Sequence, residues 1–547
     1  MREYEQGVHE YLARLQSEVD ELRARVETES AERLKLGEER EQYRRLYMEA
    51  LERCKTLERG IIAGRKAESY SGQDGQLALQ VLEQLLGAEP DDGASTPEAE
   101  AASRDERPRP RPKPTGRKPL PEHLPRVEIE VLPPEVEREG LNAFERIGEE
   151  TRETLEHRPA SVVVVRVVRP KFVRRGDATE QEPVVLIADA PELPIERGLA
   201  GPGMLSDTTV RRWGDHCPTN RLESIYAREG IELARSTICS WHMQLAELAS
   251  CVVDAMYEDA LTQPYLCTDA TGVLVQAKER CRRAHFWVLV APEKHVLFRY
   301  SRKHDGAAVD QLLAGYEGYL VADAHSVYDH IYGDNAITEV GCWAHARRYF
   351  FKALSSDPER AKHALSLMKG LFRIERDLAT APRKKREKAR KAKSKPIVDA
   401  FFRWCDEQRP RVLDEAPISK ALNYAHNQRV ALARFLDDGR LPMTNNISER
   451  HLRREAIGRK NWLFVGSDDG ARTNTIFVSL LASCQLHGIE PRAYLRDLFC
   501  LLPSWPKKRA LELAPAYWRE TLEHEDTQQR LAANVYRSVT LEHSPPE

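Results

Sequence analysis

Three acidic side chains occupy positions that ordinary folding does not favour. Asp269 and Asp323 each lie at or near the end of a short apolar segment, and Glu449 follows the polar run Thr444-Asn-Asn-Ile-Ser. Aspartate is depleted in strands, and an ionised carboxylate beside a buried sheet is costly unless it is paired, hydrogen-bonded or bound to a metal. Two carboxylates brought together also raise each other's pKa unless a cation lies between them. Each acid alone fits an ordinary capped or paired carboxylate. The occurrence of all three in one chain indicates a site for a divalent cation.

Oxygen donors without thiolate or histidine pairing favour Mg²⁺, with Mn²⁺ as the alternative. Two such ions can activate an oxygen nucleophile and stabilise the leaving oxygen when a phosphodiester is attacked. Cys342 and His345 form a Cys-x-x-His pair, but two ligands make only half of a tetrahedral zinc site and no second pair stands nearby. Zinc is therefore not expected, and His345 is either a hydrogen-bond donor near a phosphate or a satisfied core histidine.

A β-rich stretch is expected to position the two aspartates. Apolar and β-branched runs over 265–276, 284–291 and 295–300 predict three successive antiparallel strands. A helix is expected at 307–316. The almost wholly apolar stretch 318–323 is typical of a short strand at the centre of a buried sheet.

The segment around Glu449 predicts a basic helix. Thr444, Asn445 or Asn446 is expected to cap it, with Glu449 in the first turn. Five basic side chains follow closely and are candidate phosphate contacts: Arg450, Arg453, Arg454, Arg459 and Lys460. The spacing of the first three puts them near one helix face. A charge run is usually only a solvated face, yet this one adjoins a candidate catalytic acid.

Residues 205–262 are predicted to be helical and to include a helix-turn-helix. A first helix is expected to end near Gly230, and a second to begin at Ser236 or Thr237. Arg235, Ser236 and Thr237 are candidate DNA contacts, because the first residues of a recognition helix reach the base edges. An ordinary helical hairpin is the alternative.

The first 126 residues predict a long helix followed by a linker. In residues 1–60, Leu15, Val19, Leu22 and Val26 follow coiled-coil spacing, which predicts a homo-oligomer; a solvated helix without a partner is the alternative. Residues 61–126 read as a polar linker that ends in a basic, proline-rich strip. That strip either lies along DNA phosphates or only keeps the chain soluble.

The remaining segments differ in secondary-structure type. Residues 127–204 predict a small β unit, and 346–440 predict a helical insertion between two parts of a core at 263–345 and 441–485. A helical tail is expected at 486–547. The insertion contains the strongly basic run Arg383-Lys-Lys-Arg-Glu-Lys-Ala-Arg-Lys-Ala-Lys-Ser-Lys, for which contact with the DNA backbone is favoured over a merely solvated loop.

Composition places the chain among globular proteins. It has 547 residues, a net charge of −3, 41% hydrophobic and 31% charged residues, which excludes fibrous and wholly disordered classes. Its ten cysteines include no Cys-x-x-Cys, which argues against a disulfide framework. The charged start lacks the apolar region of a signal peptide, and no apolar stretch approaches the length of a membrane helix. A soluble, cytoplasmic protein without membrane contact is expected.

Taken together, these motifs resemble those of the insertion sequence 66 family of transposases, a bacterial DDE group. The motifs that carry the resemblance span nearly the whole chain: Gly116-Arg-Lys-Pro-Leu-Pro-Glu-His-Leu-Pro-Arg, Asp215–Trp241, Thr268-Asp-Ala, Leu320-Val-Ala-Asp-Ala-His, Cys342-Trp-Ala-His-Ala-Arg-Arg, Thr444-Asn-Asn-Ile-Ser-Glu-Arg, Asn461-Trp-Leu-Phe-Val-Gly-Ser-Asp and Cys484-Gln-Leu-His-Gly-Ile-Glu-Pro. The resemblance implies a multidomain α+β protein with an N-terminal coiled coil, a helix-turn-helix, and a ribonuclease-H-like α/β catalytic core with a helical insertion.

By this resemblance Asp269, Asp323 and Glu449 are the metal-binding catalytic triad. The supporting residues of the core are Cys342, His345 and Asn446, and Arg347 and Arg348 join the candidate DNA contacts. Water is expected to free a 3′-hydroxyl at the element end, and that hydroxyl then attacks target DNA. Partners are double-stranded DNA at the nucleoid, further copies of the chain, and accessory proteins encoded by the element.

Two departures from the family pattern stand out. Members usually carry a cysteine-rich zinc-binding segment after the basic linker, whereas this chain has no cysteine between Cys54 and Cys217. The first motif reads Asp269-Ala-Thr where Asp-Glu-Thr is more usual. The alternatives are a ribonuclease-H-like nuclease that cuts without joining, an inactive or domesticated DNA-binding derivative, and a coiled-coil scaffold, which would explain residues 1–60 alone.

Overall fold

The computed structural model describes residues 120–541, except 121, 123, 159–160, 175–184, 279 and 334–335. The predicted coiled coil over 1–60 and nearly all of the predicted linker over 61–126 lie outside these residues. The described part is α+β, as expected, and contains two mixed sheets. No helix within it has both the length and the apolar character needed to cross a membrane.

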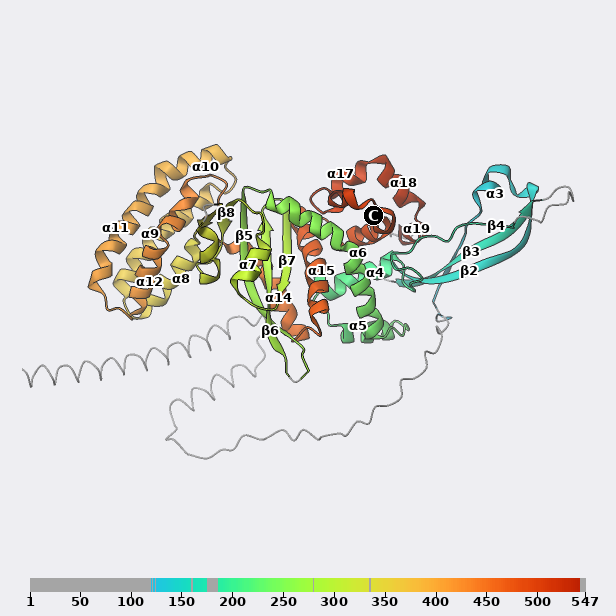
Figure 1. Ribbon diagram of the computed structural model, residues 1–547, viewed down its shortest axis with the longest axis horizontal. Coiled ribbons are helices and arrows are strands. Elements are labelled where there is room, and N and C mark those ends of the chain that lie inside the picture. Colours follow the sequence, from blue (N-terminus) through green and yellow to red (C-terminus); the bar gives the residue numbers. More distant parts are fainter. Residues whose placement is uncertain are drawn as a thin grey trace, which may run out of the picture. The chain divides into compact units, whose positions relative to one another are not determined.

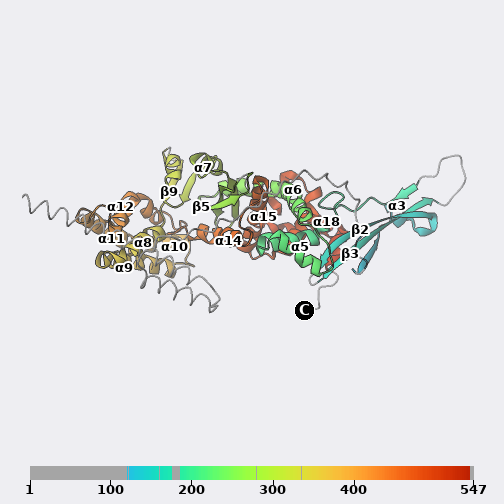
Figure 2. The same cartoon turned by 90° about the horizontal axis from the view of Figure 1, so that it is seen from below.

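The first sheet is built on one long hairpin. Its strands are β1 (Arg126–Glu130), β2 (Phe144–Arg158), β3 (Ser161–Arg174) and β4 (Val185–Ile187), with α3 (Pro134–Glu139) and η1 (Leu141–Ala143) between β1 and β2. β2 and β3 pair antiparallel along almost their whole length and run side by side in Figures 1 and 2. β1 joins β3 in parallel, and β4 joins it antiparallel.

This sheet lies in the segment predicted to be a small β unit, and a helix near the C-terminus completes its core. Val163 and Val165 of β3 are fully buried and share a cluster with Tyr536 and Val539. Both of these belong to α19 (Val535–Leu541), the last helix described. Apolar burial against the end of the chain thus supplies a core in this cysteine-free segment.

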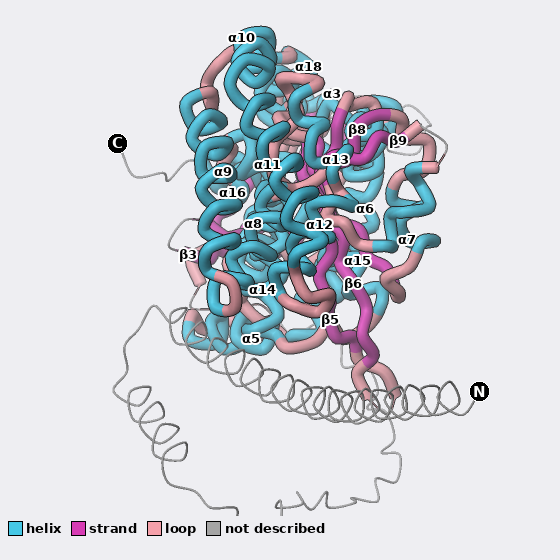
Figure 3. The backbone as a smooth tube through the Cα atoms, turned by 90° about the vertical axis from the view of Figure 1, so that its left-hand side faces the viewer, coloured by secondary structure: helices cyan, strands magenta, loops and turns pink. Residues whose placement is uncertain are grey.

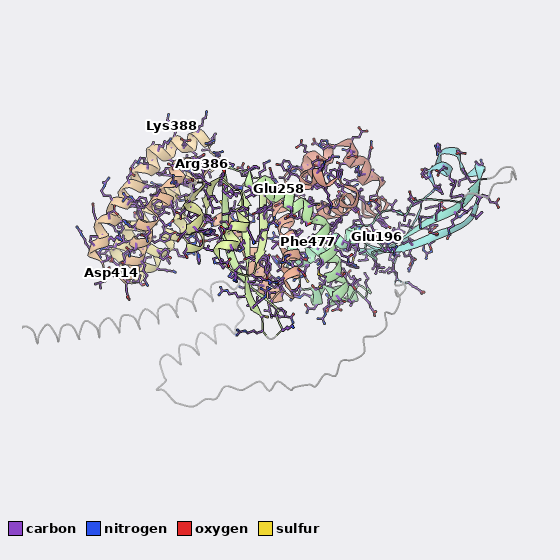
Figure 4. All side chains as sticks on the ribbon, viewed as in Figure 1. Glu196, Glu258, Arg386, Lys388, Asp414 and Phe477 are labelled. Atoms are coloured by element: carbon purple, nitrogen blue, oxygen red, sulfur yellow. The ribbon has the colours of Figure 1, made fainter. Side chains whose placement is uncertain are left out.

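Four helical elements connect the two sheets. They are α4 (Pro202–Thr209), η2 (Val210–Gly214), α5 (Thr219–Arg228) and α6 (Arg235–Leu261). α5 and α6 lie where the two helices of the helix-turn-helix were expected, although α6 is much longer than a recognition helix needs. The ring of Trp213 stacks on Phe477 of a later helix at 6.3 Å, and Phe477 lies in the interior in Figure 4.

The second sheet has the strand order β7-β6-β5-β8-β9. Its strands are β5 (Tyr265–Val275), β6 (Arg282–Ala291), β7 (His295–Ser301), β8 (Gly318–Val321) and β9 (Ile337–Val340). β5, β6 and β7 form the expected antiparallel run, whereas β8 and β9 join in parallel. α7 (Gly306–Leu312) and η3 (Ser326–Tyr332) complete this region. α7 is shorter than predicted, because the backbone leaves the helix at Leu313 and adopts a positive φ at Gly315.

Helix α15 (Asp468–His487) covers the free edge of β7. Ser479 accepts the Phe298 N–H at 2.7 Å, and Ser483 accepts the Val296 N–H at 3.0 Å. These two N–H groups point away from β6 and would otherwise be buried without partners. The serine spacing of one helical turn matches the two-residue spacing of outward N–H groups on the strand, so the sheet edge is closed.

Between β9 and the Glu449 helix the chain forms an all-helical group, as predicted for the insertion (Figure 3). Its elements are α8 (Trp343–Lys352), η4 (Ala353–Ser355), α9 (Pro358–Asp377), α10 (Arg383–Ala389), η5 (Arg390–Ser394), α11 (Lys395–Gln408), η6 (Arg409–Arg411), α12 (Pro417–Asn427), α13 (Arg429–Ala433) and η7 (Arg434–Leu436). The chain then returns to the second sheet through α14 (Asn446–Trp462) and α15 (Asp468–His487). The tail comprises α16 (Pro491–Leu501), η8 (Leu502–Ser504), η9 (Lys507–Leu513), α17 (Trp518–Glu523), α18 (Glu525–Ala533) and α19.

Candidate active site

Strand register brings the two aspartates together. β5 and β8 are parallel neighbours, and Cys267 pairs with Val321. Asp269 and Asp323 each follow two residues later, so they leave the sheet at the same level and on the same face. Asp269 is still within β5, whereas Asp323 lies just beyond the end of β8. Two acids far apart in the sequence therefore become neighbours.

Asp269 lies in an environment that disfavours its charge. Burial, which is the largest cause, and the negative charges of Asp323 and Glu449 raise its pKa to about 7. The N–H of Ala270, which donates to Asp269 Oδ1 at 2.7 Å, and the guanidinium of Arg348 act in the opposite direction. Asp323 and Glu449 are thus both within electrostatic range of Asp269.

Glu449 is positioned by α14 and held by two side chains of α8. It lies in the first turn of α14, as predicted. Its Oε1 is 3.3 Å from Arg348 Nη2 and 3.4 Å from His345 Nε2. Arg348, which was predicted to contact DNA, therefore contacts a candidate catalytic carboxylate.

The start of α14 is tied to both β5 and α8 through one buried residue. Asn445 is the N-cap residue, and its Nδ2 donates to the Thr268 carbonyl at 2.7 Å. Its backbone N–H donates to Cys342 Sγ at 3.2 Å. Cys342 itself is buried at the N-cap of α8. The predicted support from Cys342 is thus a structural contact. The amide that makes it belongs to Asn445, whereas the predicted residue, Asn446, is exposed.

His345 is half-buried beside the acids. Burial lowers its pKa, and so does Arg348, while Glu449 and Asp323 raise it. The ring faces Glu449 through Nε2, and Nδ1 has no hydrogen-bond partner in the described part of the chain. Because Nδ1 is buried, His345 faces the site through Nε2 and its contact with Glu449.

The donor set fits a hard divalent cation. Within the described residues, no three His, Cys, Asp or Glu side chains are already close enough together to form a metal site. The three carboxylates nevertheless supply only oxygen donors, which Mg²⁺ and Mn²⁺ prefer. The raised pKa of Asp269 shows that Arg348 does not offset burial and the neighbouring negative charges. A cation between the acids would remove their mutual repulsion.

The basic residues of α14 have two kinds of environment. Arg450, Arg453 and Lys460 are exposed to solvent. Arg454 is half-buried and donates to Gln485 Oε1 at 2.9 Å. Arg459 donates to Thr271 Oγ1 at 2.8 Å and to the Gly272 carbonyl, so it fastens the end of α14 to β5. Arg450, Arg453 and Lys460 are thus free to contact solvent or a ligand, whereas Arg454 and Arg459 make contacts within the fold.

The other candidate DNA contacts lie at the surface. Arg235 and Ser236 are exposed in the first turn of α6, with Thr237 half-buried beside them. Arg347 is exposed on α8 next to Arg348.

One residue near the acids was not anticipated. The buried hydroxyl of Tyr328, in η3, lies against Thr268 and has its pKa raised by burial and by Asp323 and Asp269. It follows Asp323 by only five positions, and that proximity was the available sequence signal.

Comparisons with known proteins show to which family the chain is similar. A family model described as "Transposase IS66 family" matches residues 197–473, which include all three acids. Models described as "Transposase C of IS166 homeodomain" and "IS66 C-terminal element" match residues 63–129 and 479–516.

Three similar proteins come from Sinorhizobium fredii (strain NBRC 101917 / NGR234), and each is named as an uncharacterized protein. The protein y4hP is 29% identical, over 84% of this chain and 86% of its own length. The protein y4qI is 31% identical, over 73% and 77%. The protein y4jD is 28% identical, over 69% and 77%.

Proposed function

Because this chain belongs to the insertion sequence 66 family of transposases, we propose that it cuts DNA at the ends of an insertion sequence and joins them to target DNA. The observation that carries the proposal is the β5–β8 register, which places Asp269 beside Asp323, together with Glu449 within electrostatic range of Asp269. We further propose that the second sheet is the ribonuclease-H-like core implied by the family.

Asp269, Asp323 and Glu449 would hold the divalent cations, Mg²⁺ or Mn²⁺, which activate an oxygen nucleophile and stabilise the leaving oxygen. Arg348 and His345 orient Glu449 through the contacts described above. Asn445 fixes the start of the Glu449 helix to the strand of Asp269. The exposed Arg450 and Arg453, one and four residues after Glu449, bind phosphates next to the reacting one.

The reaction has two displacements at phosphorus. Water attacks the phosphodiester at the element end, a new P–O bond forms, and the bond to the 3′ oxygen breaks to leave a 3′-hydroxyl. That hydroxyl loses its proton and attacks a target phosphodiester, whose own 3′ oxygen leaves and takes up a proton. No protein–DNA covalent bond forms, so no Ser or Tyr nucleophile is assigned.

DNA recognition falls to the exposed start of α6. Arg235, Ser236 and Thr237 would read the element ends, as in a helix-turn-helix. Homo-oligomerisation through residues 1–60 and help from accessory proteins of the element remain part of the proposal.

The test uses duplexes that carry the inverted repeats bracketing the gene, with Mg²⁺ or Mn²⁺ and a target plasmid. The expected result is a joined product for the wild type, and none for Asp269→Asn, which should still bind the duplex. Cleavage without joining would identify a nuclease, and binding without cleavage in either metal would identify an inactive derivative.

A further inference from the structure

Three large apolar side chains are exposed together where α14 ends against the β5–β6 hairpin. We call Leu274, Leu463 and Phe464 the tip patch; their exposed fractions are 47%, 66% and 42%. Leu274 lies near the end of β5, and the other two follow directly after α14. Grouped apolar side chains on a surface rimmed by polar residues are typical of interaction sites.

Backbone pairing sets the direction of these side chains. Val465 forms a parallel bridge with Val275, its N–H donates to the Leu274 carbonyl, and its own carbonyl accepts from Gln276, both at 2.8 Å. Val465 and Val275 point together into a buried cluster. Because successive residues of an extended chain alternate between faces, Leu274 and Phe464 share the opposite face, toward solvent.

Leu463 is held in a strained turn. Its φ is 61° and its ψ is −51°, and the Phe464 N–H donates to the Trp462 carbonyl at 2.7 Å. This is a γ-turn with positive φ, which is rare and costs a leucine about 1–3 kcal/mol. Glycine would adopt the turn without strain. The fold thus retains an unfavourable backbone conformation at Leu463, although the side chain of this residue is exposed to solvent.

The surroundings of the tip patch are basic. Lys278, Arg280 and Arg283 of the hairpin and Lys460 of α14 are exposed. Asp468, the acid nearest in sequence after the patch, is neutralised by Arg282 and by Arg302, whose Nη2 is 2.6 Å away. Exposed cations around apolar side chains fit a DNA duplex, whose phosphates bind the cations while an apolar wedge enters a base step.

We propose that Leu463 and Phe464 form a wedge that unstacks one base step of the DNA held at the candidate active site, an inference that rests on the proposed function. Leu274 lies five residues beyond Asp269 on β5, or roughly 17 Å at ~3.3 Å per residue. For DNA that follows the strand, this corresponds to about five base pairs at ~3.4 Å each. The unstacked step therefore lies about five base pairs from the cleaved phosphate.

The experiment uses the full-length Asp323→Asn protein, which should bind DNA without cutting it, and the inverted-repeat duplexes with 2-aminopurine placed at successive positions. A local rise in fluorescence is expected at one step. It should be lost in Leu463→Gly, which keeps and relaxes the turn, and in Phe464→Ala. The matched control is Leu413→Ala, which removes an equally apolar side chain, 83% exposed, from the insertion.

A mismatch at the responding step gives a second readout, because an unpaired step is easier to unstack. The mismatch should tighten DNA binding by the Asp323→Asn protein about tenfold. It should tighten binding much less when Leu463→Gly or Phe464→Ala is added. Uniform fluorescence along a bound duplex overturns the wedge, even if the wild type joins DNA. The wedge is also overturned if Leu463→Gly and Phe464→Ala leave the fluorescence signal unchanged and only lower the mass measured by sedimentation. That result would identify the tip patch as a contact between copies of the chain. A local signal without joining by the wild type would support the wedge and reject the transposase.

Discussion

At the scale of single residues, several carboxylates of this protein are buried, but their surroundings differ. Burial raises the pKa of Glu156 to about 8 and that of Glu455 to about 7. Glu156 accepts backbone N–H groups, and Glu455 accepts from the Asn474 amide. Asp269 instead faces two further acids. This difference supports the proposal that Asp269 binds a cation, whereas the hydrogen bonds of the other two are structural.

Glu156 gives the fold a testable dependence on pH. Its Oε1 accepts the Met204 N–H at 2.7 Å at the start of α4, and the close approach of Gly201 and Gly203 encloses the carboxyl. Its pKa rises from 4.5 when unfolded to about 8 when folded. Between these values the folded state binds more protons, so the free energy of unfolding falls as pH rises, by at most about 1.4 kcal/mol per pH unit.

Urea unfolding of wild type and Glu156→Gln between about pH 5 and pH 8 measures this slope. The wild type should lose stability across the range, and the variant should lose less, because its amide does not titrate. Equal slopes for the two proteins would show that Glu156 is ionised in the folded state.

The types of the site residues were predictable from the sequence, but their partners were not. Asp269 and Asp323 were singled out because aspartate is depleted in strands, and Glu449 because it adds a third carboxylate in basic surroundings. The sequence could not distinguish Asn445 from Asn446, since both precede the same helix and only the fold buries one of them. Nor could it show that Arg348 contacts Glu449, a pairing that depends on how α8 meets α14.

At the scale of elements, the basic run of the insertion divides into two faces. Arg383, Arg386 and Arg390 follow helical spacing and bind Asp438, backbone carbonyls and Glu375, respectively. Lys384, Lys385 and Lys388 are exposed. Figure 4 shows Lys388 at the outer edge of the insertion. The predicted DNA contact therefore falls to the lysines, while the arginines hold the helices together.

Substitutions on the two faces should affect different properties: the stability of the insertion on the arginine face, and DNA binding on the lysine face. Arg390 is fully buried, with Nη2 2.6 Å from Glu375 Oε2 and Nη1 donating to the carbonyls of Phe435 and Asp438. Arg390→Ala leaves these groups unpaired and should destabilise the insertion by about 3–5 kcal/mol, measured by hydrogen exchange of α9 and α11.

The matched variant Lys384→Ala/Lys385→Ala/Lys388→Ala should leave that exchange unchanged and weaken DNA binding. The slope of log affinity against log salt should fall by up to about 0.9 for each lost phosphate contact. An unchanged slope would mean that these lysines only solvate the helix.

The long strands of the second sheet were predictable because their apolar runs are long and bounded by turns. β9 was not anticipated, since its four residues, Ile337–Val340, carry too weak a pattern and gain stability only beside β8. The bridge between Val275 and Val465 was also beyond sequence reasoning, because it joins a hairpin to a helix end far along the chain.

At the scale of the whole molecule, distant parts of the chain complete one another. The first sheet closes its core with Tyr536 and Val539, and the second closes its free edge with Ser479 and Ser483. Such long-range contacts leave no local pattern, so the order of elements could be predicted while their packing could not. They also imply that removing the C-terminal helix would expose the core of the first sheet.

The predicted coiled coil over 1–60 makes the association state testable in the full chain. Val19→Lys/Leu22→Lys puts two charges on the expected apolar stripe and should shift the protein toward monomer in analytical ultracentrifugation. The matched control is Ser17→Lys/Ala24→Lys, which adds the same charge on the side of the helix away from the stripe and should leave the mass unchanged. Equal masses for all three proteins would place the oligomer contact elsewhere.

The most direct test of the proposed chemistry is metal rescue at Asp323. Asp323→Cys replaces a hard oxygen ligand with a thiolate, which binds Mn²⁺ better than Mg²⁺. We expect no strand transfer by this variant in Mg²⁺ and recovery in Mn²⁺, whereas Asp329→Cys, at an exposed position nearby, should join DNA in both metals. Full strand transfer by Asp323→Cys in Mg²⁺ would contradict the claim that Asp323 binds the catalytic cation.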